Sequence, residues 1–421
     1  MMKQFSAPRG TKDLLPSEIL LWREVETKAR QILSNYNYQE IRTPIFEETG
    51  LFKRSLGQTS EVVNKQLLEL ASNKGEEEGF ALRPEGTAPI VRAYIENGLD
   101  RQEGITKLFY IGPMFRGERP QKGRLRQFHQ IGVEVLGADT SNPYLDAEVI
   151  ALNVNILKVL GLNNFKLRIN TLGSLQDKEN FSSHLRGLLQ SKKSGLCEDC
   201  QDRFERNVFR ILDCKNQLCR EMVGSLHLGY DHLAQESILY FSKVKNALED
   251  LGIDFEAVPH LVRGLDYYTH TVFEICDSSL GSQDALSAGG RYGNLVSQLG
   301  GPQTDAVGFA LGIERVLLAM PSGNHEPLER LEVYILALDE NVFPKAFQIL
   351  NQLRSAGISS DISYKVSSIK SQMRSAHKAG ARHAIILGED EHKKGVVSLK
   401  DMEGGGQREV DWNHLIEVFQ K

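Results

Sequence analysis

Alternating apolar and polar residues between positions 108 and 136 predict an antiparallel hairpin. Its strands are 108–115 and 127–136, joined by a basic loop around Pro120 and Gly123. Alternation in the returning strand separates Ile131, Val133 and Val135 from the opposite face, which holds Phe128, Gln130, Gly132, Glu134 and Leu136. Burying a glutamine and a glutamate without partners costs a few kcal/mol each, so this face indicates a bound ligand. A solvated sheet face with a basic tip explains the stretch equally well.

Helical spacing of apolar residues predicts a first helix that starts at the N-cap Ser17 and ends near Leu33. A short strand over 38–45 follows, and we expect residues 47–56 to continue it. Residues 80–89 predict a strand that runs into a tight turn, and we expect a helix to begin over 90–95. Further on, the pattern predicts a helix over 146–160, a strand over 166–170 and a helix over 295–299.

The pattern changes twice in the second half of the chain. Residues 171–259 are charged and rich in helical spacing, whereas 261–275 and 307–318 return to strand patterns. Residues 321–329 contain Gly and Pro and predict a linker. Beyond it, strands and helices alternate in a way that predicts a small α/β domain with a largely parallel sheet. We expect its elements at 333–338, 342–356, 359–362, 367–379, 384–387, 395–399 and 412–419.

Composition limits the class of protein. The chain has 421 residues, of which 41% are hydrophobic, enough for two to four domains with sizeable cores. Its net charge of −5 means that contacts with nucleic acid must come from local basic patches, such as the hairpin loop. A run of eighteen apolar residues is missing, as is an apolar segment at the N-terminus. We therefore expect a cytoplasmic protein without a membrane partner.

Four of the five cysteines are clustered in the sequence. Cys197 and Cys200 form C-x-x-C, and Cys214 and Cys219 form C-x-x-x-x-C, a spacing close to that of zinc sites. The residues between the two pairs, however, predict one continuous helix with ordinary buried thiols. We favour the buried thiols and assign no metal ligands, while the spacing leaves a structural zinc open.

Several strings together resemble one family. Residues 115–130, FRGERPQKGRLRQFHQ, resemble motif 2 of the class II aminoacyl-tRNA synthetases, and in detail the histidyl-tRNA synthetase family. Similar matches are PRGTKDLLP at 8–16, LRPEGT at 82–87, RGLDYY at 263–268, GGRY at 289–292, and a motif 3 at 307–318. The helix, strand and proline near Pro44 resemble motif 1, which forms the dimer interface in this class. Gly293 departs from the polar or acidic residue that usually follows GGRY.

The resemblance implies an α+β fold. It implies a class II synthetase-like catalytic core with an antiparallel sheet, formed by residues 1–170 and 260–322. A helical insertion domain is expected at 171–259 and a C-terminal α/β anticodon-binding domain at 330–421. The basic residues Lys365, Lys370, Arg374, Lys378 and Arg382 would lie on one side of that last domain, although a solvated helix face is the commoner explanation of such a pattern.

The resemblance also implies a set of site residues. Those expected to bind histidine are Glu85, Gly86, Thr87, Arg116, Gln130, Glu134, Arg263, Tyr267, Tyr268 and Tyr292. Those expected to bind ATP are Arg116, Arg126, Phe128 and Arg315, with adenine held between Arg315 and Phe128. Arg263 and Arg116 are the expected catalytic residues, and Arg119 and Gln121 would contact the tRNA end. His270 is expected on the strand surface and not in catalysis.

The function implied is ligation of histidine to tRNA(His), with ATP and Mg²⁺, by a homodimer. Glu134 and Tyr268 would read the imidazole ring. An alternative is a synthetase-like regulatory subunit of histidine biosynthesis that lacks aminoacylation activity, but such chains are expected to lack the C-terminal domain and some of the arginines. A synthetase for another amino acid is opposed by RGLDYY together with Gln130 and Glu134.

Overall fold

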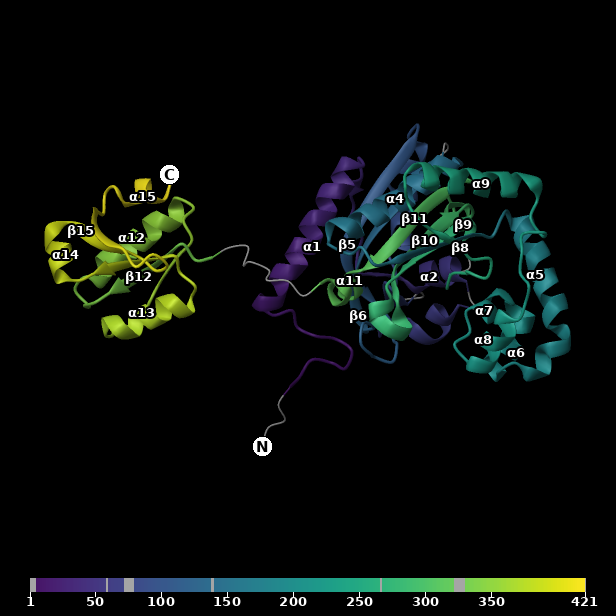
Figure 1. The fold of residues 1–421 in the computed structure, drawn as a ribbon, viewed down its shortest axis with the longest axis horizontal. Helices are drawn as coiled ribbons and strands as arrows, with labels where there is room; N and C mark the ends of the chain where they lie inside the picture. Colours follow the sequence, from purple (N-terminus) through teal and green to yellow (C-terminus); the bar gives the residue numbers. More distant parts are fainter. Residues whose placement is uncertain are drawn as a thin grey trace. The chain divides into compact units, whose positions relative to one another are not determined.

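The computed structural model describes residues 5–57, 60–71, 79–137, 140–265, 267–321 and 330–420. Contacts divide the chain into two compact units, Met1–Gly323 and Asn324–Lys421 (Figure 1). Most of the predicted linker, residues 322–329, lies outside the described residues, as does Asp266. Among the described helices, none is long and apolar enough to cross a membrane.

The first unit is built on an eight-stranded sheet. In spatial order its strands are β1 (Gln39–Glu40), β5 (Ile105–Phe115), β6 (Gln127–Gly137), β11 (Ala306–Gly312), β10 (Ala285–Tyr292), β9 (Thr269–Cys276), β7 (Lys166–Thr171) and β8 (Glu256–Ala257). The short edge strands β1 and β8 pair in parallel with their neighbours, and every other pairing in this sheet is antiparallel. The predicted α+β core with an antiparallel sheet is therefore confirmed.

The alternation in β6 separates the two faces of this sheet as predicted. Ile131, Val133 and Val135 enter a large apolar core. That core is completed by the helices α1 (Pro16–Asn35), α4 (Pro143–Val159), α9 (Gln235–Asp250) and α11 (Ile313–Ala319). Leu136 and Phe128 belong instead to the core of the opposite face, with α2 (Thr49–Leu56), α3 (Thr87–Glu96) and α10 (Leu295–Gln298). This second face is the one predicted to hold a ligand.

Two local predictions near the N-terminus are wrong. Helix α1 begins at Pro16 with Leu15 as its N-cap, two residues before the predicted N-cap Ser17. Proline is favoured at the first helical position, where its missing N–H is not needed. Residues 49–56 form α2 and do not continue a strand, because Phe52, Ser55 and Leu56 are buried at helical spacing.

A small sheet stands beside the second face. It consists of β2 (Phe46–Glu48), β4 (Phe80–Leu82) and β3 (Leu68–Glu69). The π-helix η1 (Val62–Gln66) and the 3₁₀ helix η2 (Leu99–Arg101) complete this part of the unit, whereas the 3₁₀ helix η4 (Ser278–Gln283) packs against the core of the first face through Leu280. Strand β4 leads directly into the turn that begins α3, so it positions residues 83–87 against the large sheet.

The charged middle region contains a compact helical lobe with a core of its own. The lobe comprises α5 (Leu175–Leu189), η3 (Gln190–Gly195), α6 (Glu198–Arg206), α7 (Phe209–Leu212) and α8 (Gln217–Gly224). The predicted continuous helix between the cysteine pairs is wrong, because Asn207 is extended (φ −155°, ψ 90°) and separates α6 from α7. Helix α9 and strand β8 also fall within 171–259 but join the main core and sheet.

The second unit is a five-stranded sheet with helices. Its strand order is β13 (Ser360–Ile362), β12 (Val333–Ala337), β14 (His383–Leu387), β15 (Val396–Asp401) and β16 (Gln407–Asp411). Its helices are α12 (Phe343–Ser355), α13 (Ile369–Lys378), α14 (Glu389–Lys394) and α15 (Leu415–Phe419). The sheet is mixed and not largely parallel, since β15 and β16 pair antiparallel. The pattern missed β16 because that edge strand is mostly exposed and polar.

Candidate active site

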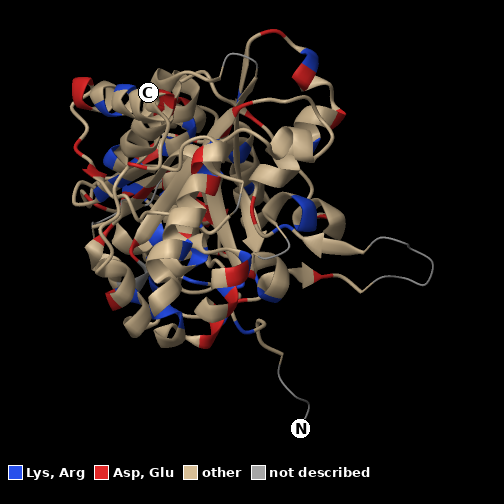
Figure 2. Cartoon of the chain, turned by 90° about the vertical axis from the view of Figure 1, so that its right-hand side faces the viewer, with Lys and Arg blue, Asp and Glu red and all other residues tan. Residues whose placement is uncertain are grey.

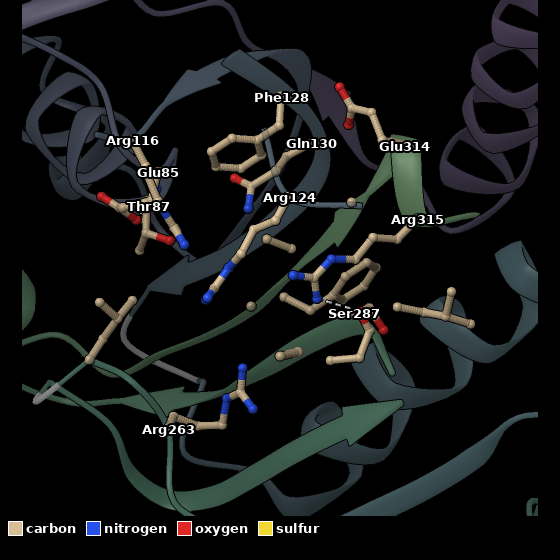
Figure 3. A pocket seen from close by; sticks show the side chains of 18 of the residues that line it. Glu85, Thr87, Arg116, Arg124, Phe128, Gln130, Arg263, Ser287, Glu314 and Arg315 are labelled. Carbon is tan, nitrogen blue, oxygen red and sulfur yellow. Dashed lines mark hydrogen bonds between the residues drawn. The ribbon is translucent and has the colours of Figure 1, made fainter. Parts of the chain in front are cut away.

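A large cavity opens on the second face of the eight-stranded sheet. It encloses about 1000 Å³ including its open mouth. Its lining comes from β5, β6, β10, β11, the β5–β6 loop, the start of α3 with the turn before it, the start of α11, and from Arg263, Leu265, Tyr267 and Tyr268. Figure 3 shows Arg116 and Arg124 of the β5–β6 loop, Arg263 and Arg315 of α11 pointing into this one hollow. Concave sites with apolar walls and a few convergent polar groups are the usual places where small ligands bind.

Glu134 is the buried carboxylate at one end of the cavity. Its side chain is 2% exposed and accepts hydrogen bonds from the Thr87 hydroxyl (2.6 Å) and the Tyr292 hydroxyl (2.6 Å). Burial raises the pKa of Glu134 to about 8, although both hydroxyl groups favour the charged form. A carboxyl poised near neutral pH in a ligand cavity is a functional candidate.

Glycines make room for this carboxylate and for the tyrosine beside it. A Cβ atom at Gly308, which pairs with Glu134 across β11 and β6, would lie 2.1 Å from Glu134 Oε2. Cβ atoms at Gly86 and Gly132 would both lie 2.3 Å from the Tyr110 ring. The register of the sheet thus places Gly308 opposite Glu134 and Gly132 opposite Tyr110, where these two cavity side chains cross the neighbouring strand.

Glu85 lies at the start of α3 and is also buried. Its two oxygens accept the backbone N–H groups of Thr87 (2.8 Å) and Ala88 (2.9 Å). Burial raises the pKa of Glu85, while these hydrogen bonds and the charge of Arg116 act in the opposite direction. A second carboxyl group therefore faces the same end of the cavity as Glu134, and a cationic ligand would stabilise the charged form of both.

Aromatic rings form the wall between these carboxylates and the rest of the cavity. Tyr267 lies 4.6 Å from Tyr268 and 5.5 Å from Tyr292, measured between ring centroids. The Tyr110 hydroxyl and the Gln130 Oε1 atom are buried and lack a hydrogen-bond partner among the described residues. Since buried polar groups are normally paired, these two atoms are available to a polar ligand.

The other end of the cavity is lined by arginines, of which Arg116 also lies beside Glu85 (Figure 3). Arg116 donates to the Pro84 carbonyl (2.9 Å) and lies 5.1 Å from the centre of the Phe128 ring. Arg315 donates to the carbonyls of Gly123 (3.1 Å) and Ala285 (2.7 Å). Burial lowers the pKa of both arginines, which are held mainly by neutral carbonyls. Arg116 also lies 4.0 Å from the Glu118 carboxylate, whereas Arg315 has no ion pair among the described residues, so its charge is left to be balanced by an anion.

Two further arginines at this end are paired with carboxylates. Arg263 donates to Glu274 (2.8 Å), and Arg124 contacts Glu118 (2.5 Å). These ion pairs hold the guanidinium groups in place while leaving them in the cavity lining. An arginine held in this way is pre-organised for an incoming phosphate.

Most of the predicted site residues line this cavity. They are Glu85, Thr87, Arg116, Phe128, Gln130, Glu134, Arg263, Tyr267, Tyr268, Tyr292 and Arg315. Gly86 is not part of the lining and packs against Tyr110. Arg126 is directed to the carbonyls of Glu118 and Arg9, and Arg119 and Gln121 are exposed on the loop.

Sequence reasoning did not assign several lining residues. Tyr110, Glu118, Arg124, Ser287 and Glu314 all face the cavity. Tyr110 lies on the ligand face of β5 and pairs with Gly132 of β6. The alternation of the predicted hairpin could therefore have identified it. Ser287 and Glu314 carry no local signal, because only the folding of the sheet brings them to the cavity.

His270 and Gly293 were both singled out in the sequence, and neither lines the cavity. His270 is partly buried with a left-handed φ of 44°, so it is not a strand-surface residue, and it does not line the cavity. Gly293 replaces the usual polar residue because a Cβ atom there would lie 2.8 Å from Asp305 Oδ1. The neighbouring Arg291 is buried and pairs with Asp146, so it supports the sheet from outside the cavity.

Comparison with known proteins places this cavity in a family. A histidyl-tRNA synthetase family model matches residues 10–316, and an anticodon-binding domain model matches residues 332–421. Histidine–tRNA ligases from Halothermothrix orenii and a Geobacillus species are 45% and 44% identical, over 99% of this chain and 99% of each relative. The apo structure of S. aureus histidyl-tRNA synthetase aligns with a TM-score of 0.83 at 36% identity, covering 99% of this chain and all of that one. The chain therefore belongs to the histidyl-tRNA synthetase family.

Proposed function

We propose that this chain is a histidine–tRNA ligase that activates L-histidine with ATP and transfers it to tRNA(His). The observation that carries the proposal is a single cavity with a carboxylate and tyrosine end and an arginine end. An amino acid with a basic side chain suits the first end, and a nucleoside triphosphate suits the second. Two such ends joined in one cavity fit an aminoacyl-adenylate.

The histidine end of this proposal rests on complementary hydrogen bonding. Glu134 and Tyr268 bond the two imidazole nitrogens, and Glu85 with Thr87 and Gln130 receives the α-ammonium group. Tyr267 and Tyr292 close the pocket around the ring. A site built for these bonds leaves buried groups unpaired when another amino acid enters, a penalty that can reach about 10⁴–10⁵-fold in specificity.

The first step forms the adenylate at the arginine end. The histidine carboxylate attacks the α-phosphorus of ATP in line, a P–O bond forms, and pyrophosphate leaves with the electrons of the bond that breaks. Arg116 and Arg263 neutralise the phosphate oxygens as charge builds on them. Arg315 and Phe128 hold the adenine between them. The Arg116 guanidinium also lies over the Phe128 ring, so Arg116 and the adenine would both contact this ring when ATP is bound.

In the second step, the 3′-terminal ribose hydroxyl of tRNA attacks the carbonyl carbon of the adenylate, and AMP leaves. Arg119 and Gln121 are exposed beside the cavity mouth and are our candidates for contacts to the tRNA end. Acidic and basic side chains are interspersed over the molecule, so local patches must hold the RNA (Figure 2). On α13, the exposed Lys370, Arg374 and Lys378 form such a patch at four-residue spacing.

Mg²⁺ fits the oxygen donors of the cavity. Glu118 and Glu314 line its arginine end, and carboxylate oxygens together with substrate phosphates are the usual ligands of this ion. When bound, Mg²⁺ supplies charge neutralisation on the polyphosphate. We assign Glu118 and Glu314 as the residues that would hold it.

We also infer that the chain works as a homodimer in the cytoplasm. Strand β2 lies at the edge of its sheet, and Ile45 (46% exposed) and Phe46 (49% exposed) are large apolar residues that a second copy would cover. All five cysteines are free thiols, which suits a reducing compartment. In this proposal, a Phe46→Glu substitution yields monomers in sedimentation experiments.

Histidine-dependent exchange of pyrophosphate into ATP tests the proposed function. Purified protein is assayed with each of the twenty amino acids, and the same samples are tested for charging of tRNA(His). We expect exchange with histidine alone and histidine-dependent charging. Histidine binding without exchange or charging would instead favour the regulatory-subunit alternative, and exchange with another amino acid would contradict the assignment of the substrate.

A further inference from the structure

Four cysteine sulfurs meet in the helical lobe formed by α5, η3, α6, α7 and α8. Cys197 is the N-cap of α6 and Cys200 lies in its first turn, whereas Cys214 follows α7 and Cys219 lies in α8. The four Sγ atoms all lie within 4.8 Å of one another, and Cys197 Sγ lies 3.8 Å from Cys214 Sγ. Cys200 and Cys219 are fully buried, Cys214 is 8% exposed, and Cys197 is partly exposed.

This spacing fits a tetrahedral metal site. A Zn–S distance of about 2.3 Å places the sulfurs of a tetrahedral Cys₄ site about 3.8 Å apart. The separation between Cys197 Sγ and Cys214 Sγ has that value, and no other separation exceeds 4.8 Å. A disulfide needs sulfurs about 2 Å apart, and all four of these cysteines are free.

Hydrogen-bond donors already point at three of these sulfurs. The backbone N–H of Cys197 donates to Cys219 Sγ (3.3 Å), and that of Asn216 donates to Cys214 Sγ (3.4 Å). The Arg203 guanidinium donates to Cys200 Sγ (3.9 Å). Such donors stabilise thiolates and orient them around a metal, and the arginine offsets part of the negative charge of a Cys₄ site.

The short helices of the lobe need strong tertiary support, which a metal cross-link would supply. Its helices α6, α7 and α8 contain 9, 4 and 8 residues, lengths that are marginal without strong tertiary support. Three of the four cysteines are themselves part of the small apolar core that holds these helices together. A metal would join the start of α6, the residue after the C-cap of α7 and the first turn of α8 at one point.

We propose that Cys197, Cys200, Cys214 and Cys219 bind one structural Zn²⁺ ion that holds the helical lobe together. The sequence favoured buried thiols because the two pairs were expected at opposite ends of one helix. The break at Asn207 turns α7 back, and it is this turn that brings the second pair to the first. The closed set of four protein ligands leaves no position for a substrate, so the role is structural.

Metal analysis of the whole protein tests the proposal without any substitution. Protein purified under reducing conditions and dialysed against a weak chelator is analysed for zinc and iron by mass spectrometry. We expect about one zinc per chain, released when an organomercurial blocks the thiols. Replacement by Co²⁺ is expected to give the visible absorption of tetrahedral cobalt thiolate. A chain that holds no metal after reconstitution with zinc, or that holds iron instead, would overturn the proposal.

Variants locate the site. The double substitution Cys200→Ser and Cys219→Ser is expected to lower zinc below about one tenth of an ion per chain. The matched control, Cys276→Ser, changes the fifth cysteine, which lies at the end of β9 outside the lobe, and is expected to keep its zinc. Removing zinc from the unmodified protein with a strong chelator is expected to expose residues 190–225 to limited proteolysis. Equal zinc in the double variant and the control, or an unchanged cleavage pattern after zinc removal, would contradict the assignment.

Discussion

At the scale of single residues, Glu134 shows how burial and chemistry are linked. Its two hydroxyl donors and its 2% exposure hold a carboxyl whose pKa lies near 8, far above the ordinary value of 4.5. A raised pKa means that the folded, ligand-free protein holds a proton at this carboxyl over a pH range in which the unfolded chain has released it. Charging Glu134 in the empty cavity therefore costs stability, and a bound imidazole is the natural compensation.

This linkage gives a pH dependence with a defined sign. Because the folded pKa is raised, the contribution of Glu134 to stability is fully present below pH 4.5 and is lost as the pH rises to about 8. Each pH unit in that window costs about 1.4 kcal/mol. We compare the melting temperatures of the ligand-free protein and of Glu134→Gln. The difference, unmodified protein minus variant, is expected to decrease as the pH rises from 5 to 8. A difference that rises or stays constant would mean that the carboxyl is already charged.

Arg263 gives a second prediction at this scale. Its pairing with Glu274 fixes the guanidinium at the cationic end of the cavity. Arg263→Ala is expected to lower histidine-dependent pyrophosphate exchange by about 10²–10³-fold, the usual cost of removing a charge-stabilising donor from a transition state. Arg263→Lys, which keeps the charge but loses the forked geometry, should be intermediate. Near-normal exchange in a folded Arg263→Ala protein would remove this residue from the reaction.

At the scale of elements, the site depends on the register between β6 and β11. Glu134 lies opposite Gly308, and Gln130 lies opposite Gly312, so each polar side chain of the ligand face crosses a strand position without a side chain. The alternation in β6 made its two faces predictable from sequence. The partner strand was not predictable in this way, because β11 lies about 170 residues further along the chain and only the folded sheet sets its register.

The Gly308→Ala substitution tests this register. The added methyl group would meet Glu134 Oε2 at 2.1 Å and the Val133 carbonyl oxygen at 2.3 Å. We expect a loss of stability of about 1–3 kcal/mol and at least a tenfold weaker affinity for histidine in a binding titration. Gly187→Ala in α5 is the matched control, since a methyl group there meets nothing within 4 Å and alanine favours a helix. Unchanged histidine affinity in Gly308→Ala would place Glu134 elsewhere.

Elements also show where sequence reasoning reaches its limit. Long amphipathic or alternating segments such as α1, α4 and the β5–β6 hairpin were predicted within a few residues. Strand β16 and helix α14 were missed because they are mostly exposed and carry little apolar periodicity. The helix break at Asn207 was missed because neither proline nor glycine marks it. The cavity residues were found mainly by family resemblance, since periodicity alone could not join segments as distant as Glu85 and Arg315.

At the scale of the whole molecule, the cavity and the C-terminal unit have separate tasks. Every residue that lines the cavity belongs to the first unit, and the second unit has its own apolar cores. Activation of histidine is therefore expected to be independent of the C-terminal unit, whereas charging of tRNA requires both.

The α13 patch offers a test of this division. Replacing Lys370, Arg374 and Lys378 by Ala is expected to weaken tRNA(His) binding. The slope of the logarithm of the binding constant against the logarithm of the salt concentration should become shallower by about three, one per lost phosphate contact. Pyrophosphate exchange should not change. The control replaces Lys393 and Lys394 on α14, which lie beside acidic partners. Equal binding by the triple variant and the control would show that the RNA contacts another face.

The central claim is that Glu134 selects histidine at one end of a cavity whose other end binds ATP. The most direct test is the pair of Michaelis constants of Glu134→Ala in pyrophosphate exchange, one for histidine and one for ATP. We predict that KM for histidine rises by at least 100-fold while KM for ATP changes less than threefold, because the lost group contacts only the imidazole. Equal changes in the two constants, or none in either, would contradict this account of the site.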